Sequence, residues 1–259
     1  MTNLVKDRFF TKVIEDFRVM SIVVLKQVGY VMDLFEDTYE DNPEIYQEIY
    51  NNERIIDSLD VKLRREMIDA IVLYQPKATE LRQMMGFYDM TSDMERMGDQ
   101  VMNIARMVKG MNLSGEICTK YRTDISKLLK KARKMVKHSV KSFDTGDSQL
   151  AKLTIEKDEQ VDIDFHALLN NLRSDNSGQT FDDTALNDLF CIHTIAHCVE
   201  RIADYATNVS EATIYMTDGR DIKHSEFKTS EAIELLGHLP EDAPESARRA
   251  IGEAPEATK

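Results

Sequence analysis

Apolar residues recur at intervals of three and four over most of the chain, and strict alternation of apolar and polar residues is scarce. This spacing places side chains on one face of an α-helix. A first helix is predicted over about residues 11–35, with one apolar face formed by Val13, Phe17, Met20, Val24, Val28, Val31 and Phe35. Because only ten glycines and five prolines interrupt 259 residues, the sequence predicts an all-α fold.

Turn-forming residues divide the rest of the pattern into five further helices. They are expected at about residues 43–73, 77–109, 116–143, 148–172 and 181–216. Pro76 separates the second from the third, because the residue before a proline is pushed out of helical geometry. Gly219 is a typical residue for ending the sixth helix. We therefore predict six long helices.

The two halves of this pattern repeat each other. The segment Met94–Asp99 with Asn103 matches Val199–Asp204 with Asn208 at a constant offset of 105 residues, and the first helices require a gap of about three residues. This repeat predicts two tandem, pseudo-symmetric three-helix bundles at 1–113 and 114–224. The remaining segment, 225–259, is rich in Glu, Ala, Pro and Ser, which predicts a largely disordered acidic tail with at most one short helix near 230–236.

Each half carries two pairs of carboxylates at positions i and i+4, one pair on each of two helices. The pairs are Glu53 and Asp57 with Glu95 and Asp99, and then Asp158 and Asp162 with Glu200 and Asp204. If neighbouring helices bring four carboxylates together, they repel one another unless a cation or a proton intervenes. Oxygen ligands suit Fe, Mn, Mg or Ca, and Zn is also compatible. In the competing interpretation, Arg96 and Arg201 neutralise these groups in ordinary solvated helix faces.

Two histidines distinguish the second half. His193 and His197 lie one turn apart and share a helix face with Glu200 and Asp204. Imidazole ligands would favour Zn or Fe at the second site. The competing interpretation is that both rings are partly buried packing residues.

Composition excludes several classes of function. A net charge of −13 and a pI near 5.0 disfavour nucleic acid as a partner. Three cysteines lack the spacing of a disulfide framework or a zinc knuckle, and the start of the chain lacks the features of a signal peptide. No apolar stretch reaches the roughly 20 residues that a membrane helix needs. A cytoplasmic protein without direct membrane insertion is expected.

No recognisable catalytic motif is present. A ferritin-like di-iron enzyme needs Glu-x-x-His on two helices, and none of the six histidines follows a glutamate at that spacing. A glycine-rich phosphate loop and a nucleophile signature are also absent. The sequence therefore predicts a protein that is not an enzyme.

The repeated acidic segments resemble those of the PhoU family of phosphate-uptake regulators, in which a Leu-Glu-Arg-Ile-Gly-Asp-like stretch is followed by an Asn-Ile pair. Here they read Met94–Asp99 with Asn103-Ile104 and Val199–Asp204 with Asn208-Val209. The resemblance implies a cytoplasmic, usually homodimeric regulator that acts with a phosphate transporter and its sensor histidine kinase. It also implies metal ions, for example Fe, Zn or Mn, held by the eight acidic residues.

Some features depart from this pattern or leave other functions open. Ala203 stands where the family usually has glycine, and the tail after His224 lies outside the resemblance. One alternative is a metal-independent helical interaction platform, and another is a PhoU-like module that acts on a sodium-phosphate cotransporter. A carboxylate-bridged metalloenzyme is the least favoured.

Overall fold

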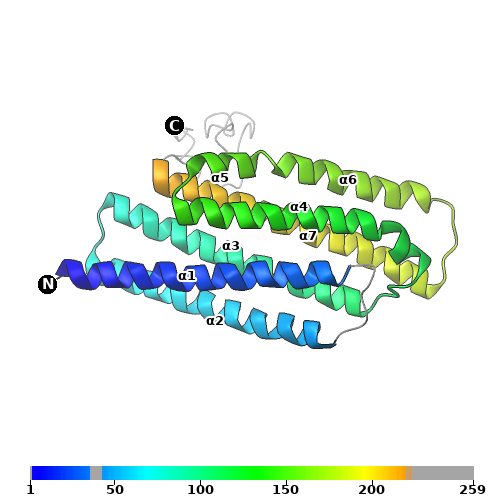
Figure 1. Cartoon of the computed structure of the whole chain (residues 1–259), viewed down its shortest axis with the longest axis horizontal. Coiled ribbons are helices and arrows are strands. Elements are labelled where there is room, and N and C mark those ends of the chain that lie inside the picture. Colours follow the sequence, from blue (N-terminus) through cyan, green and yellow to red (C-terminus); the bar gives the residue numbers. More distant parts are fainter. Residues whose placement is uncertain (1, 36–42, 220–221, 223–259) are drawn as a thin grey trace, which may run out of the picture. The chain divides into compact units, whose positions relative to one another are not determined.

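The computed structural model describes residues 2–35, 43–219 and 222, and residues 1–220 form one compact unit built from helices (Figure 1). The helices are α1 (Thr2–Asp33), α2 (Pro43–Tyr74), α3 (Ala78–Lys109), α4 (Glu116–Thr145), α5 (Ser148–Ile155), α6 (Asp158–Asp175) and α7 (Asp183–Asp218). The predicted all-α class is confirmed. None of these helices combines the length and the apolar character that crossing a membrane requires.

The helix boundaries differ from the predicted ones in two places. Helix α1 begins at Thr2, well before the predicted start near residue 11. The predicted helix 148–172 is divided at Glu156 and Lys157 into α5 and α6, although neither proline nor glycine lies there. Both residues keep right-handed helical φ and ψ angles, so the break is a change of direction between two helical segments. The segment 225–259, with the short helix expected at 230–236, lies outside the described residues.

Local side-chain chemistry fixes several helix ends. The Asp147 carboxylate accepts hydrogen bonds from the backbone N–H groups of Gln149 and Leu150 at 3.0 and 2.9 Å, which caps α5. Asp182 caps α7 in the same way, through the N–H of Ala185 at 2.7 Å. Gly146 and Gly219 end α4 and α7 in the left-handed conformation, with φ of 64° and 72°. The predicted end at Gly219 is thus confirmed.

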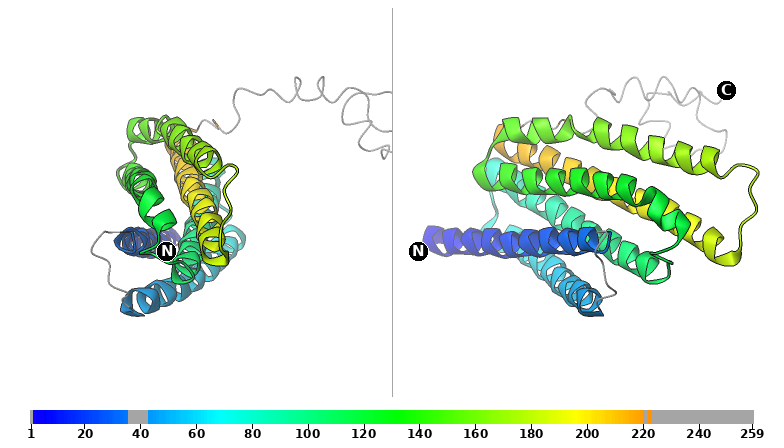
Figure 2. Two further views of the ribbon diagram at one scale, coloured as in Figure 1. Left: turned by 90° about the vertical axis from the view of Figure 1, so that its right-hand side faces the viewer. Right: turned by 45° about the vertical axis from the view of Figure 1, so that its right-hand side comes forward.

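The two bundles, α1–α3 and α4–α7, share one continuous hydrophobic core along the α3–α7 contact. The end-on view in Figure 2 shows α1 and α4 on one side of the α3–α7 pair. At one end of that contact, a Cβ atom at Gly86 would lie 2.5 Å from Met216 Cγ, so a larger residue there would displace the Met216 side chain. Near its middle, Asn208 Nδ2 donates to the buried Asp93 Oδ1 at 3.3 Å. The two repeats therefore form one packed unit.

Candidate carboxylate sites

The first acidic site comprises Glu53 and Asp57 on α2 with Glu95 and Asp99 on α3. Packing of α2 against α3 brings both pairs close enough for Asp57, Asp99 and Glu95 to act electrostatically on Glu53. The pKa of Glu53 is raised to about 7, first by burial and then by the negative charges of Asp57, Asp99 and Glu95, against the effect of a hydrogen bond from Gln27. The pKa of Glu95 is also raised, first by burial and then by Asp99. The structure thus brings the four predicted carboxylates together.

Gln27 of α1 supports the first acidic site from inside the bundle. Its side chain is fully buried, and Nε2 donates to Ile49 O at 3.1 Å and to Glu53 Oε2 at 3.2 Å. Its carbonyl oxygen Oε1 is buried without a hydrogen-bond partner. Since a buried amide is costly unless it is satisfied, Gln27 has a positioning role for Glu53. The signal for it in the sequence is a polar residue on the apolar face of the first helix.

Gly98 of α3 provides the space that the Glu53 carboxylate occupies. A Cβ atom at this position would lie 2.7 Å from Glu53 Oε2, 3.2 Å from Ile56 Cδ1 and 3.5 Å from Gln27 Oε1. The first distance is shorter than van der Waals contact allows. A larger residue would therefore displace the carboxylate from its place beside Gln27.

A further polar cluster borders the first acidic site and was not predicted. Asp60 pairs with Arg64 at 3.7 Å, and Arg64 Nη2 donates to the Tyr88 hydroxyl at 2.7 Å. Asp60 Oδ1 is buried without a hydrogen-bond partner, and burial raises the pKa of this carboxyl group. Because Asp60 also contributes to raising the pKa of Glu95, it extends the negative region of the first acidic site.

The second acidic site comprises Asp158 and Asp162 on α6 with Glu200 and Asp204 on α7. Burial raises the pKa of Glu200 to about 7, with further contributions from Asp204, Asp162 and Asp158. Burial also raises the pKa of Asp158 to about 6 and shifts that of Asp204 upward. The second set of four predicted carboxylates is therefore brought together as well.

In the second site, an apolar residue takes the position that Gln27 has in the first. Matching buried positions relate α1 to α4 by 108 residues, so that Gln27 corresponds to Met135 (135 − 27 = 108), a buried side chain without a hydrogen-bond donor. Asp158 Oδ1 and Thr207 Oγ1 are buried without a partner of normal hydrogen-bond geometry, although the Thr207 hydroxyl counteracts the rise of the Asp158 pKa. Ala203 stands in place of Gly98, opposite a shorter acid. The unpaired carboxylate oxygen can accept a cation.

The two histidines lie on α7, within the two turns before Glu200, with both residues exposed and their rings in contact. Their centroids are 4.7 Å apart, and the His197 ring meets the edge of Phe165 at the same centroid distance. Burial lowers the pKa of His197, with further lowering by His193 and Arg201. A neutral imidazole is the form that binds metal, but the Phe165 contact also serves packing. Participation of His193 and His197 in a metal site stays a prediction.

Arginine does not neutralise these carboxylates through close contacts. Among the described ion pairs, none joins Arg96 or Arg201 to an acidic residue of either site, and both guanidinium groups are exposed. Their charges lower the pKa values of Glu95 and Glu200 less than burial raises them. Within the described residues, no three His, Cys, Asp or Glu side chains converge into a preformed metal cage. Binding of a cation would therefore draw the carboxylates inward.

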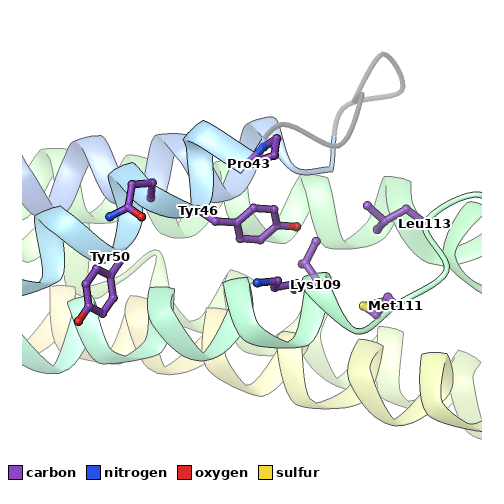
Figure 3. A pocket seen from close by; sticks show the side chains of 8 residues that line it. Pro43, Tyr46, Tyr50, Lys109, Met111 and Leu113 are labelled. Atoms are coloured by element: carbon purple, nitrogen blue, oxygen red, sulfur yellow. The ribbon is translucent and has the colours of Figure 1, made fainter.

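A separate groove opens between the start of α2 and the end of α3, with a volume of about 630 Å³. Tyr46 extends across it from α2, near Lys109 of α3 (Figure 3). No carboxylate of either acidic site lines this groove.

The buried cysteines also lie outside the acidic sites. Burial raises the pKa of Cys118 to about 12 and that of Cys198 to about 11, so both thiols stay protonated.

Comparison with known proteins agrees with this architecture. A family described as "PhoU domain" matches residues 17–108 and 125–213, one segment in each bundle and together more than half of the chain. The chain belongs to the PhoU family. This is a family of accessory and regulatory proteins of phosphate transport, not of enzymes.

Several relatives cover most of the chain. It is 36% identical over 221 residues to the phosphate-specific transport system accessory protein PhoU homolog of Aquifex aeolicus, covering 84% of this chain and 96% of the relative. The homolog of Clostridium acetobutylicum is 28% identical, with coverages of 78% and 90%. The crystal structure of PhoU from Pseudomonas aeruginosa superimposes with a TM-score of 0.73 at 22% identity, covering 83% of this chain and 99% of that one. That likeness establishes the fold.

Proposed function

We propose that this PhoU-family protein restrains phosphate uptake by acting on a phosphate transporter and its sensor histidine kinase, and that its two acidic sites bind metal ions. The relatives' description as accessory proteins of the phosphate-specific transport system supports an association with a transporter. A cytoplasmic location and a homodimer belong to the same proposal.

The observation that carries the metal-binding part is the pairing of burial with uncompensated negative charge. Glu53 and Glu200 each have a pKa of about 7, because burial and three neighbouring carboxylates disfavour ionisation. A divalent or trivalent cation would remove this penalty by pairing with several oxygens at once. The residues that would hold it are Glu53, Asp57, Glu95 and Asp99 in one site, and Asp158, Asp162, Glu200 and Asp204 in the other. Fe, Mn and Zn suit such donors, and His193 and His197 would add nitrogen to the second set.

The regulatory role is tested by measuring phosphate uptake in cells that lack their own PhoU protein. We expect the wild-type chain to reduce uptake at high external phosphate, and the Glu95→Ala/Asp99→Ala variant to reduce it less. The matched control is Asp69→Ala/Asp89→Ala, which removes the same charge from exposed positions of α2 and α3. Unchanged uptake with the wild-type chain, at confirmed expression, would contradict the transport role.

A metal-independent interaction platform is the second candidate, favoured by the absence of a preformed metal cage among the described residues. It predicts that the Glu95→Ala/Asp99→Ala variant restrains uptake as well as the wild-type chain does. The same cells therefore separate the two candidates. Repeating the assay in cells whose phosphate enters by a sodium-phosphate cotransporter alone identifies which kind of transporter responds.

A further inference from the structure

Helix α4 carries a concentration of positive charge that is unusual for this acidic chain. Between Ile125 and Phe143 it has seven lysine or arginine residues and no acidic residue, whereas the whole chain has 46 acidic and 33 basic residues. Five of the lysines follow one another at intervals of three and four, on the face opposite the buried side of the helix: Lys127, Lys130, Lys134, Lys137 and Lys141. We call these five residues the lysine ridge. At 1.5 Å per residue, it extends over roughly 21 Å.

Most of the lysine ridge has no counter-charge. Lys127 lies 3.5 Å from Asp124, but Lys130, Lys134, Lys137 and Lys141 form no ion pair with any carboxylate that the structure describes. The exposed fraction of each is high. Burial lowers the pKa of the neighbouring His138, and the charges of Lys157 and of three ridge lysines lower it further. A positive potential that is not neutralised therefore surrounds this part of α4.

The neighbouring helices complete the surface. Helix α1 runs antiparallel to α4, because Arg18 Nε contacts Asp144 Oδ1 at 2.6 Å and Ser126 Oγ donates to Phe35 O at the other end. This register places Ile22, which is 65% exposed, at the level of the Lys137–Lys141 stretch along the neighbouring helix. On α6, Asp164 pairs with Lys131 of α4. The ridge is thus an exposed basic surface with an exposed apolar residue of α1 at the same level.

The lysine ridge and the second acidic site lie on different sides of the second bundle. In a three-helix bundle the outer face of one helix lies opposite the groove between the other two, and the second acidic site occupies the α6–α7 groove. The ridge is therefore separated from the negative charge of that site by the hydrophobic core. A protein with a net charge of −13 can approach an anionic surface when its positive face is turned toward that surface.

We propose that the lysine ridge of α4, with Ile22 of α1, is a docking surface for an anionic lipid bilayer. No ridge lysine lines either of the two grooves given by the described residues, one between α2 and α3 and one beside the start of α7. Lysine provides mobile point charges instead of the planar fork by which arginine binds a single phosphate. Clusters of four to eight such residues on an amphipathic helix are typical of binding to acidic headgroups. Docking in this way would hold the protein at the membrane without insertion.

The test is co-sedimentation of the full-length protein with vesicles of phosphatidylcholine or of an equal mixture with phosphatidylglycerol. We expect binding to the anionic vesicles only, weakened by added salt because exposed charges are screened. Lys130→Glu/Lys134→Glu/Lys137→Glu should lower the partition coefficient by about tenfold or more, since each lysine contributes near the surface. The control Lys12→Glu/Lys77→Glu/Lys109→Glu makes the same change of net charge at exposed positions elsewhere and should bind like wild type.

Three results would overturn the proposal. One is equal binding of the wild-type protein to neutral and anionic vesicles, or to neither. Another is an equal loss in both triple variants, which would show an effect of net charge alone. The third is retention on a soluble polyanion such as heparin that depends on the ridge, together with no vesicle binding, which would assign the ridge to a soluble partner. Circular dichroism and thermal melting show whether each variant is folded.

Discussion

The first acidic site holds the carboxyl group of Glu53 with a buried amide, whereas the second holds the shorter Asp158 without one. Gly98 faces the longer acid, and Ala203 occupies the matching position in the repeat that has the shorter one. The first site therefore combines a glycine with the longer acid, and the second combines an alanine with the shorter acid. This comparison teaches that a duplicated site can keep its charge while its support changes. We expect the first site to be the more rigid one and the second to adapt more readily to a cation.

The largest expected effect is the pH dependence of the metal-free protein. The pKa of Glu53 is about 7 in the folded protein and 4.5 in the unfolded chain. Between pH 4.5 and pH 7, the folded protein therefore binds more protons than the unfolded chain. Stability then falls as pH rises from about 4.5 to 7, by about 3 kcal/mol for Glu53. Denaturant unfolding with a chelator present measures this loss. Glu53→Gln should flatten the dependence more than Asp158→Asn does, and equal effects would contradict the difference between the sites.

The next effect concerns Gln27. Gln27→Met gives the first site the residue type that the second has at Met135, and it leaves the buried Glu53 carboxylate without its donor. We expect a loss of about 1–3 kcal/mol in the free energy of unfolding at pH 8, and less at pH 5, where Glu53 is protonated. Met135→Leu is the control and should cost less than about 1.5 kcal/mol at both pH values. A pH-independent cost for Gln27→Met would mean that the hydrogen bond from Gln27 to Glu53 does not stabilise the ionised carboxylate, and that only the packing of Gln27 and its hydrogen bond to Ile49 O matter.

A smaller effect is expected from exchanging the space at the helix contact. Gly98→Ala displaces the Glu53 carboxylate and should weaken cation binding at the first site by about tenfold, the scale typical of residues that orient ligands. Adding Glu53→Asp shortens the acid and should restore part of the affinity, as in the second repeat. Metal titration of proteins that also carry Glu200→Ala/Asp204→Ala isolates the first site. If the shorter acid gives no rescue, the two positions are not coupled.

The smallest effect is expected at His197. His197→Phe keeps a ring against Phe165 and removes the nitrogen ligands, so the fold and the melting temperature should stay close to wild type. If His197 binds metal, the preference of the second site for Zn over Mn should fall several-fold, because imidazole suits Zn. Competition titrations measure the ratio of the two affinities. An unchanged ratio would restrict His197 to packing.

The sequence predicted the helices and the gathering of the eight carboxylates because both depend on periodicity and on an exact repeat. It could not predict the division between α5 and α6, since no helix-breaking residue lies at Glu156 or Lys157. Helix α1 extends beyond its predicted start because a helix continues through polar residues when its later turns are packed.

The support of the first acidic site was also beyond sequence reasoning. Gln27 appeared as one polar residue on an apolar face, and nothing in the spacing connects it with Glu53, which lies 26 residues later. The contact between Gly98 and Glu53 depends on the distance between α2 and α3, which periodicity does not give. The distances between packed helices therefore determine which residues contact the carboxylates, and the sequence repeat does not give these distances.

Elemental analysis of protein purified without added metal or chelator is the most direct test of the two carboxylate sites. We predict stoichiometric Fe, Zn or Mn in the wild-type protein, a partial loss in Glu95→Ala/Asp99→Ala and in Glu200→Ala/Asp204→Ala, and a complete loss when the four changes are combined. The control Asp69→Ala/Asp89→Ala should retain the wild-type content. Absence of metal from the wild-type protein, also after dialysis against each ion, would contradict the account.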